Sequence, residues 1–183
     1  MSRRILIYDD GAGLLSWAWW FGSGFIGSFD VVLPVRSWTQ AYRELAALPR
    51  VPAAALQLWC HGNQGDVFLG DEDVNVEALG LALGPLAPNA YVWFRACAAF
   101  GGVKGHRFAA DAVDALRCGV VGHTRIVGAP CQSGGHGLLP GQAPYWPVTE
   151  GVGPDGKLLR SGPLVPNTCV VTRSNPPAAW WVR

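Results

Sequence analysis

The stretch LQLWCHGNQGDVFLG, residues 56–70, joins an apolar run to a polar loop at His61 and Gly62. A second apolar run, YVWFRACAAFGG (91–102), ends in a similar way at Cys97. Short continuous apolar runs are typical of strands that are buried on both faces of a parallel sheet. Ligands of such sheets bind at the edge formed by the carboxyl ends of the strands. We therefore expect His61 and Cys97 to belong to one site.

Similar apolar runs along the chain alternate with helical periodicity, which predicts a mostly parallel sheet covered by helices. The expected strands are 4–8, 31–35, 55–60, 91–96 and 119–127, with 168–173 as a last strand. The expected helices are 37–48, 74–86 and 104–117, with a small hairpin at 65–74. Pro34 predicts an edge strand for 31–35, because proline lacks a ladder donor. Ser37 followed by Gln40 has the spacing of a capping box.

Composition favours one α/β domain over residues 1–183, with an irregular wrap rich in Gly and Pro from about residue 128. A net charge of +1 without a basic cluster argues against a nucleic-acid partner. The apolar stretch 14–29 is shorter than the roughly 20 residues of a membrane span and is interrupted by glycines. We expect no span there, but a buried or partly exposed loop and helix.

Five cysteines without a CxxC pair argue against a disulfide framework and against a structural zinc site. A reducing, cytoplasmic location is the expectation that follows. A free thiol is mostly protonated near neutral pH, and an adjacent imidazole generates the nucleophile for acyl transfer. Gly62 and the segment after Cys97 have backbone N–H groups suited to a developing oxyanion. This chemistry requires no metal and no cofactor.

The strand ends LWCHG and WFRAC resemble the His-Gly and Ala-Cys strand ends of caspase-like cysteine peptidases, a clan that includes caspases, metacaspases, legumains, gingipains and bacterial CHAT-type peptidases. The resemblance covers about residues 3–128 and implies an α/β three-layer sandwich with a mostly parallel central sheet. It also implies peptide-bond hydrolysis through an acyl-enzyme. In that reaction His61 is the general base and Cys97 the nucleophile, while Gly62 and the Cys97 amide form the oxyanion hole.

Three interpretations of the charged residues near this edge stay open. Arg95 lies two residues before Cys97, so strand alternation places both on one side. By the resemblance, Arg95 lines the pocket for the residue before the scissile bond and favours an acidic side chain. Alternatively, Arg95 forms a structural salt bridge to Asp9 or Asp10, which follow the first strand. If Asp9 or Asp10 faces the pocket instead, a basic substrate residue is preferred.

Two other functions compete with the peptidase. One is an inactive caspase-like module that binds a protein partner through the tryptophan-rich region 17–38. The other is a cysteine hydrolase that acts on a small amide or thioester. Among the remaining residues, alternation places Cys60 in the core, and His136 is the second candidate for the base.

Overall fold

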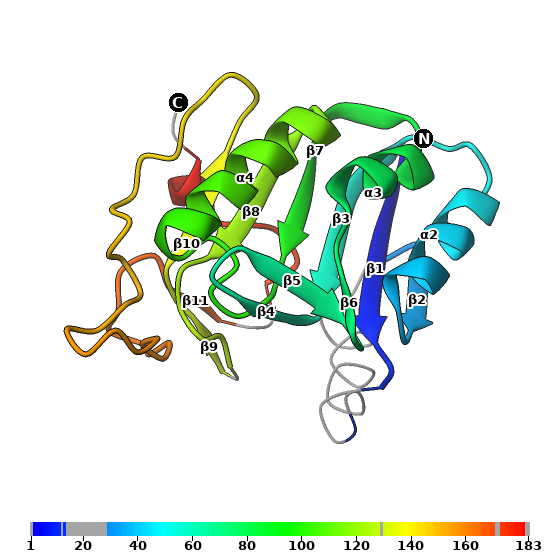
Figure 1. Ribbon diagram of the computed structural model, residues 1–183. Coiled ribbons are helices and arrows are strands. Elements are labelled where there is room, and N and C mark those ends of the chain that lie inside the picture. Colours follow the sequence, from blue (N-terminus) through cyan, green and yellow to red (C-terminus); the bar gives the residue numbers. More distant parts are fainter. Residues whose placement is uncertain (1, 12, 14–28, 129, 171–172, 182–183) are drawn as a thin grey trace.

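The computed structural model describes residues 2–11, 13, 29–128, 130–170 and 173–181. Its centre is a six-stranded sheet in the order β2-β1-β3-β7-β8-β10 (Figure 1). The strands are β1 (Arg3–Asp9), β2 (Val31–Val35), β3 (Ala53–Trp59), β7 (Leu86–Phe94), β8 (Gly119–His123) and β10 (Gly135–Leu138). Neighbouring strands are parallel except β10, which is antiparallel to β8. The predicted mostly parallel α/β sheet is confirmed, and β2 is the edge strand that Pro34 indicated.

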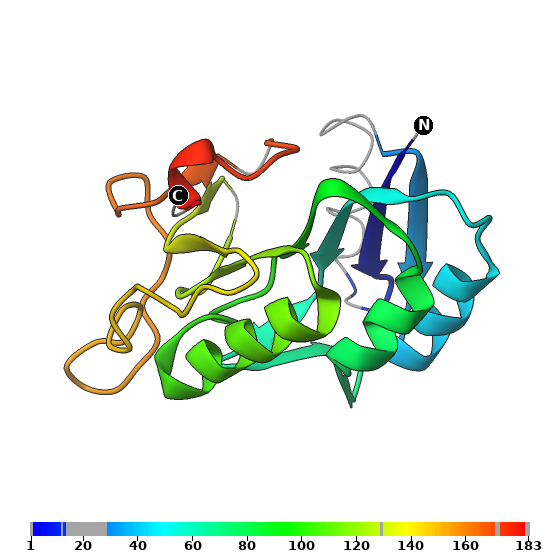
Figure 2. The same cartoon turned by 90° about the horizontal axis from the view of Figure 1, so that it is seen from above.

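Three helices cover one face of this sheet: α2 (Trp38–Ala47), α3 (Val76–Leu83) and α4 (Gly102–Leu116) (Figure 2). The cap predicted for the first helix is present, because the Ser37 side chain accepts a hydrogen bond from the Gln40 amide. The apolar faces of the helices pack against buried side chains of β1, β3 and β7, including Ile7, Leu58 and Phe94. This is the main core, and it fixes the three strands whose carboxyl ends carry the candidate site.

The opposite face is covered toward β8 by the C-terminal part of the chain (Figure 2). Trp93 and Val121 of the sheet pack there with Cys169 and Trp180. The segments involved are β9 (Cys131–Gln132), β11 (Cys169–Val170) and the short 3-10 helix η1 (Ala178–Trp180). The last strand predicted at 168–173 is therefore only partly confirmed. Its first residues pair with β9 in a separate two-stranded sheet and do not extend the main sheet.

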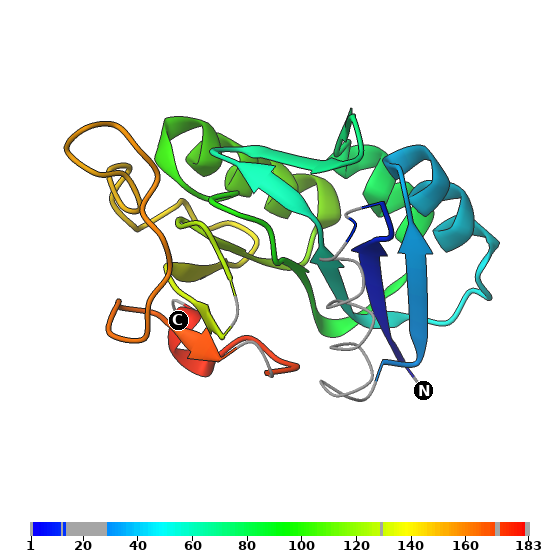
Figure 3. The same ribbon diagram turned by 90° about the horizontal axis from the view of Figure 1, so that it is seen from below.

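A small antiparallel sheet lies near the carboxyl ends of the central strands (Figure 3). It consists of β4 (His61–Asn63), β5 (Asp66–Leu69) and β6 (Glu72–Asp73). The hairpin predicted at 65–74 is confirmed as β5 and β6. The third strand, β4, was not predicted, and it begins at His61. The polar segment after β3 is therefore a regular hairpin, and its pairing holds His61 in place.

The strand β10 was also not predicted, since it lies in the segment expected to be irregular. Its glycines have a packing reason: a β-carbon at Gly135 would collide with the Trp180 ring, and one at Gly137 would lie 2.6 Å from Trp181. Most of the apolar stretch 14–29 lies outside the described residues. Within the described part of the chain, no helix has the length and apolarity needed to cross a membrane.

Candidate functional site

Two acids end β1, and they have different partners. Asp9 is 3% exposed, and its Oδ2 lies 3.7 Å from Nε2 of His61. Its second oxygen, Oδ1, accepts a hydrogen bond from the Gly11 amide at 2.7 Å. Asp10 turns toward the sheet edge, where Oδ2 lies 3.3 Å from the Arg36 guanidinium. The carboxylate of Asp9 is therefore positioned on the imidazole, while Asp10 belongs to a surface ion pair.

The His61 ring is fixed from a second side. It stacks on Phe68 of β5 at 5.7 Å between centroids and 18° between planes. The pairing of β4 with β5 places His61 directly opposite Phe68. The imidazole remains 38% exposed, so a proton donor or acceptor can reach it from solvent or from a bound molecule. Stacking and the Asp9 carboxylate together limit the rotation of the ring.

At Gly62 the segment that follows β3 packs closely against the segment that follows β7. A β-carbon at Gly62 would lie 2.7 Å from the Cys97 carbonyl oxygen and 2.9 Å from the Ala96 β-carbon. The backbone beside His61 therefore packs directly on the peptide of Cys97. This contact follows from the parallel pairing of β3 and β7, in which Leu58 lies opposite Phe94. The structure thus brings the His61-Gly62 and Cys97 segments to one edge of the sheet.

Cys97 lies in a tight turn between β7 and α4. Its Sγ is 3.8 Å from the Val127 carbonyl oxygen, and the next residue, Ala98, has a positive φ of 49°. The Ala98 amide donates to the Arg125 carbonyl, which ties the turn to the segment after β8. A non-glycine residue in this region of φ is uncommon and is held by its surroundings. The turn therefore fixes the position of the thiol.

The surroundings of Cys97 act on its ionisation in opposite directions. Burial raises the pKa of the thiol, while the contact with Val127 and the charge of Arg160 lower it. Burial is the largest of these effects, so the resting thiol is protonated near neutral pH. Nucleophilic attack by this sulfur needs a base that removes the proton.

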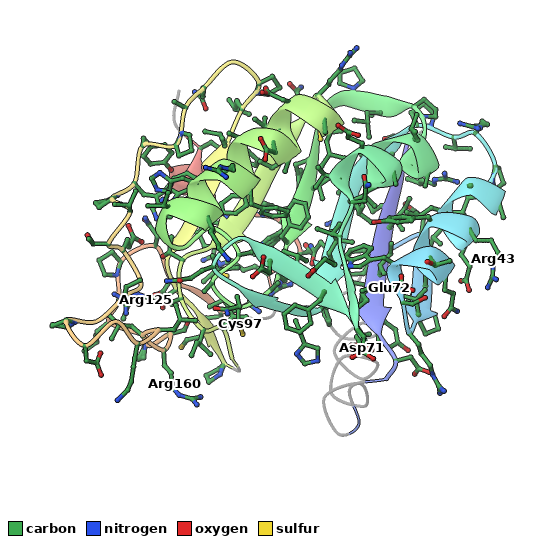
Figure 4. All side chains as sticks on the ribbon, in the orientation of Figure 1. Arg43, Asp71, Glu72, Cys97, Arg125 and Arg160 are labelled. Carbon is green, nitrogen blue, oxygen red and sulfur yellow. The ribbon has the colours of Figure 1, made fainter. Side chains whose placement is uncertain are left out.

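A cavity of about 220 Å³ adjoins the Cys97 turn through Val127. It is lined by Ile126, Val127, Gly128, Pro130, Cys131, Arg160, Ser161, Gly162 and Pro163. Backbone hydrogen bonds join Ile126 to Leu159 and Ser161, which holds Arg160 beside this segment. Figure 4 shows Arg125, Arg160 and Cys97 on the same side of the molecule. Arg160 is exposed, and among the described residues it forms no ion pair.

Arg95 is placed differently from the expectation that it lines an open pocket. It is 3% exposed, and its guanidinium lies over the Trp59 ring at 5.1 Å and the Trp93 ring at 4.3 Å. It donates hydrogen bonds to the side chains of Gln57 and Gln132. Burial lowers its pKa to about 10, so it remains charged at neutral pH. In this arrangement Arg95 cross-links the sheet to β9, and a substrate carboxylate would have to displace those contacts.

The remaining candidates take structural positions. Cys60 is 4% exposed in the main core, as alternation predicted, and burial raises its thiol pKa. His136, the second candidate for the base, lies on β10 with Nε2 2.8 Å from Glu150 and its ring stacked on Trp146. Trp38, at the end of the tryptophan-rich region, is 1% exposed and donates to the Val67 carbonyl. The rest of that region lies mostly outside the described residues.

Sequence reasoning missed the contributions of Val127 and Arg160 to the Cys97 environment. Arg160 comes from the segment expected to be an irregular wrap, and Val127 was expected to end the strand 119–127, which in the structure stops at His123. No short motif marks either residue. The pairing of Asp9 with His61 was also missed, although Asp9 was placed at the correct edge. The sequence did contain a signal for this pair: Asp9 ends β1, and β1 is the neighbour of β3, the strand that leads to His61.

The chain matches no family model, no curated protein sequence and no solved structure.

Proposed function

We propose that this protein is a caspase-like cysteine peptidase that uses His61 and Cys97 to hydrolyse peptide bonds. The observation that carries the proposal is the packing of the Gly62 backbone on the Cys97 peptide. This contact joins the two segments that the catalytic hypothesis requires. The neighbouring positions of β1, β3 and β7 also support it, since these strands are parallel and their carboxyl ends meet at one edge.

In the proposed reaction, His61 takes the proton of the Cys97 thiol as Sγ attacks the substrate carbonyl carbon. A thioester forms when the carbon–nitrogen bond breaks, and His61 returns the proton to the leaving amine. Water, with its proton accepted by His61, then hydrolyses the thioester and regenerates the thiol. The Asp9 carboxylate, 3.7 Å from Nε2, orients the imidazole and stabilises the imidazolium formed in each half-reaction.

The proposed oxyanion hole uses the backbone N–H groups of Gly62 and Cys97. Glycine at position 62 supports this role because a side chain there would collide with the Cys97 peptide. The fixed turn around Cys97 and the paired strand β4 provide rigid supports for the two donors. Rigid donors stabilise the developing charge without reorganisation during the reaction.

For the residue before the scissile bond, we expect an acidic preference that depends on Arg160. Arg160 lines the cavity beside the Cys97 turn, is exposed and has no carboxylate partner among the described residues. Arg95 remains a candidate for this role, but its guanidinium is already hydrogen-bonded in the interior. Asp9 is held by His61 and Gly11, and Asp10 lies beside Arg36, so neither favours a basic substrate residue.

A peptide mixture of mixed sequence tests the proposed activity. Wild-type protein is incubated with the mixture, and the new peptide termini are identified by mass spectrometry. We expect cleavage that disappears in Cys97→Ala and in His61→Ala and persists in Cys118→Ala, the control for a thiol at the opposite end of the sheet. Folded protein with no cleavage of any peptide, or cleavage that survives Cys97→Ala, would overturn the proposal.

A further inference from the structure

A cavity of about 790 Å³ lies at the end of the sheet opposite to the candidate site. Its walls come from the beginning of β7, the beginning of β8 and the residues after β10. The carboxyl ends of β3 and β7 lie at the other edge, so His61 and Cys97 do not line this cavity. Its volume falls in the range of cavities that bind small molecules.

An irregular stretch of β7 opens the cavity. Ala53 of β3 pairs with Leu86, yet Ala55 pairs with Tyr91. One residue of β3 is therefore opposed by four residues of β7, and the surplus chain leaves the plane of the sheet. Within this bulge Asn89 has a φ of 59°, in the left-handed region that asparagine adopts more readily than most residues with a β-carbon. Bulges are over-represented beside functional sites.

The walls are mostly apolar. Leu86, Leu139 and the Trp181 ring line the cavity, with Tyr91 in edge contact with Trp181 at 6.4 Å. Cys118 contributes a buried thiol, and burial raises its pKa to about 12. Because that thiol stays protonated, it acts here as a small apolar group. The body of a ligand that fits these walls is aromatic or aliphatic.

One positive charge lies in the cavity wall. Arg117 follows α4 with a φ of 53°, is exposed, and forms no ion pair among the described residues. The C-terminus of α4 lies beside it and carries about half a negative charge. The full charge of the guanidinium exceeds that partial charge, so the net local charge is positive. Charge complementarity therefore selects an anion.

We propose that this cavity binds a small amphipathic anion: an aromatic or aliphatic body between Leu86, Leu139 and Trp181, and a carboxylate on Arg117. A carboxylate accepts two hydrogen bonds from the planar guanidinium, which gives both affinity and orientation. The amide of Asn89, in the same wall, is a second polar group able to orient the ligand. This site is separate from His61 and Cys97, so the proposal does not depend on peptidase activity.

Titration calorimetry with 2-naphthoate and its uncharged analogue 2-naphthalenemethanol tests the site. We expect 2-naphthoate to bind wild type with one-to-one stoichiometry and more tightly than the alcohol. Arg117→Gln should weaken 2-naphthoate binding about tenfold or more while leaving the alcohol unchanged. Arg107→Gln, an exposed arginine of α4 outside the cavity, is the matched control and should bind as wild type does.

A second variant tests the location without changing charge. Ala178 lies in the cavity wall and is exposed, so Ala178→Trp places a large ring in the space without disturbing the core. Binding of 2-naphthoate should be abolished in that variant while its unfolding temperature stays near that of wild type. Equal affinity for the acid and the alcohol, affinity unchanged in Arg117→Gln or in Ala178→Trp, or no binding at millimolar 2-naphthoate would overturn the proposal.

Discussion

The backbone of Gly62 lies so close to Cys97 that a β-carbon at position 62 would be 2.7 Å from the Cys97 carbonyl oxygen. The opposing atom is main chain, which cannot rotate away as a flexible side chain can. The Gly62→Ala variant must therefore displace β4 or the Cys97 turn. We expect a loss of about 1–3 kcal/mol in the free energy of unfolding, together with loss of peptidase activity.

Urea unfolding measures this change, and Gly80 provides the control. Gly80 lies inside α3, where an added β-carbon would make ordinary contacts of 3.5 Å with Ala115 and Leu116. Gly80→Ala should raise the free energy of unfolding by about 0.5–1 kcal/mol, because alanine favours the helix. If Gly62→Ala unfolds at the same urea concentration as wild type and keeps its activity, the close contact has no functional consequence.

The charge of Arg160 should favour the thiolate of Cys97. Arg160 lowers the pKa of that thiol, so Arg160→Gln should raise it and slow alkylation by iodoacetamide near neutral pH. Arg160→Lys keeps the charge and should retain most of the rate. Mass spectrometry of the alkylated peptide across a pH series gives the apparent pKa of Cys97 itself. A profile that is the same in Arg160→Gln and wild type would contradict the role of this charge.

Asp9 should act on catalysis through His61. Asp9→Asn preserves an acceptor for the Gly11 amide but removes the negative charge beside Nε2. We expect kcat to fall by about tenfold or more, with a much smaller change in KM, because the charge matters most when the imidazolium forms. Asp10→Asn removes a charge that pairs with Arg36 and does not contact His61 among the described residues, so it is the control. Equal losses in the two variants would argue against a specific role for Asp9.

His123 should make the fold sensitive to acid. Burial, together with the nearby charge of Arg95, lowers the pKa of His123 to about 3, from an ordinary value of 6.5. In the unfolded chain this imidazole takes up a proton below pH 6.5, whereas in the folded protein it stays neutral. The stability that it contributes is therefore complete above pH 6.5 and is lost as the pH falls. We expect a loss of about 2 kcal/mol between pH 6.5 and 4.5.

Urea unfolding at several pH values tests this assignment. In that interval His123→Gln should be less dependent on pH, although less stable at pH 7, since glutamine lacks the ring that packs against Trp93 and Trp180. Half-buried His106 also has a pKa lowered mainly by burial, so His106→Gln is the matched control and should keep most of the slope. Glu150 has a lowered pKa as well, but its effect falls below pH 4.5. An unchanged slope in His123→Gln would refute the assignment.

Arg95 and Arg160 should have different roles. Arg95→Met keeps the aliphatic stem but leaves the Gln132 carbonyl without its donor, so we expect a loss of about 1–3 kcal/mol in stability. Arg160→Gln should leave stability unchanged and lower kcat/KM for peptides with Asp or Glu before the cleaved bond. Unfolding and peptide cleavage are measured on both variants. If Arg95→Met keeps normal stability but loses the preference for acidic peptides, then Arg95, and not Arg160, recognises the acidic residue.

The parallel strands of the central sheet could be predicted because they form short apolar runs, and burial on both faces makes such a run continuous in 55–60. The cap at Ser37 could also be predicted, since its hydrogen bond is local. By contrast, β10 contains alternating glycines whose reason is the later packing of Trp180 and Trp181. Such a tertiary cause leaves no local pattern.

The same distinction applies to the candidate site. His61 and Cys97 end apolar runs, so their common edge followed from parallel strands. The burial of Arg95 did not follow, because Gln132 and the neighbouring C-terminal segment cover it from far along the chain. Alternation places a side chain on a face of the sheet but does not say what covers that face. For the same reason the sequence could not place Arg160 in the wall of the cavity beside the Cys97 turn.

The most direct test of the central claim is covalent labelling of Cys97 by peptidyl acyloxymethyl ketones, which react with activated cysteine nucleophiles. The reagents carry an acidic, a basic or an apolar residue next to the reactive group, and the labelled cysteine is identified by mass spectrometry. We predict one label per chain, on Cys97, fastest for the acidic reagent and strongly slowed in His61→Ala. Labelling of Cys131 or Cys169 in place of Cys97, or labelling of Cys97 at an equal rate in His61→Ala, would contradict a nucleophile activated by His61.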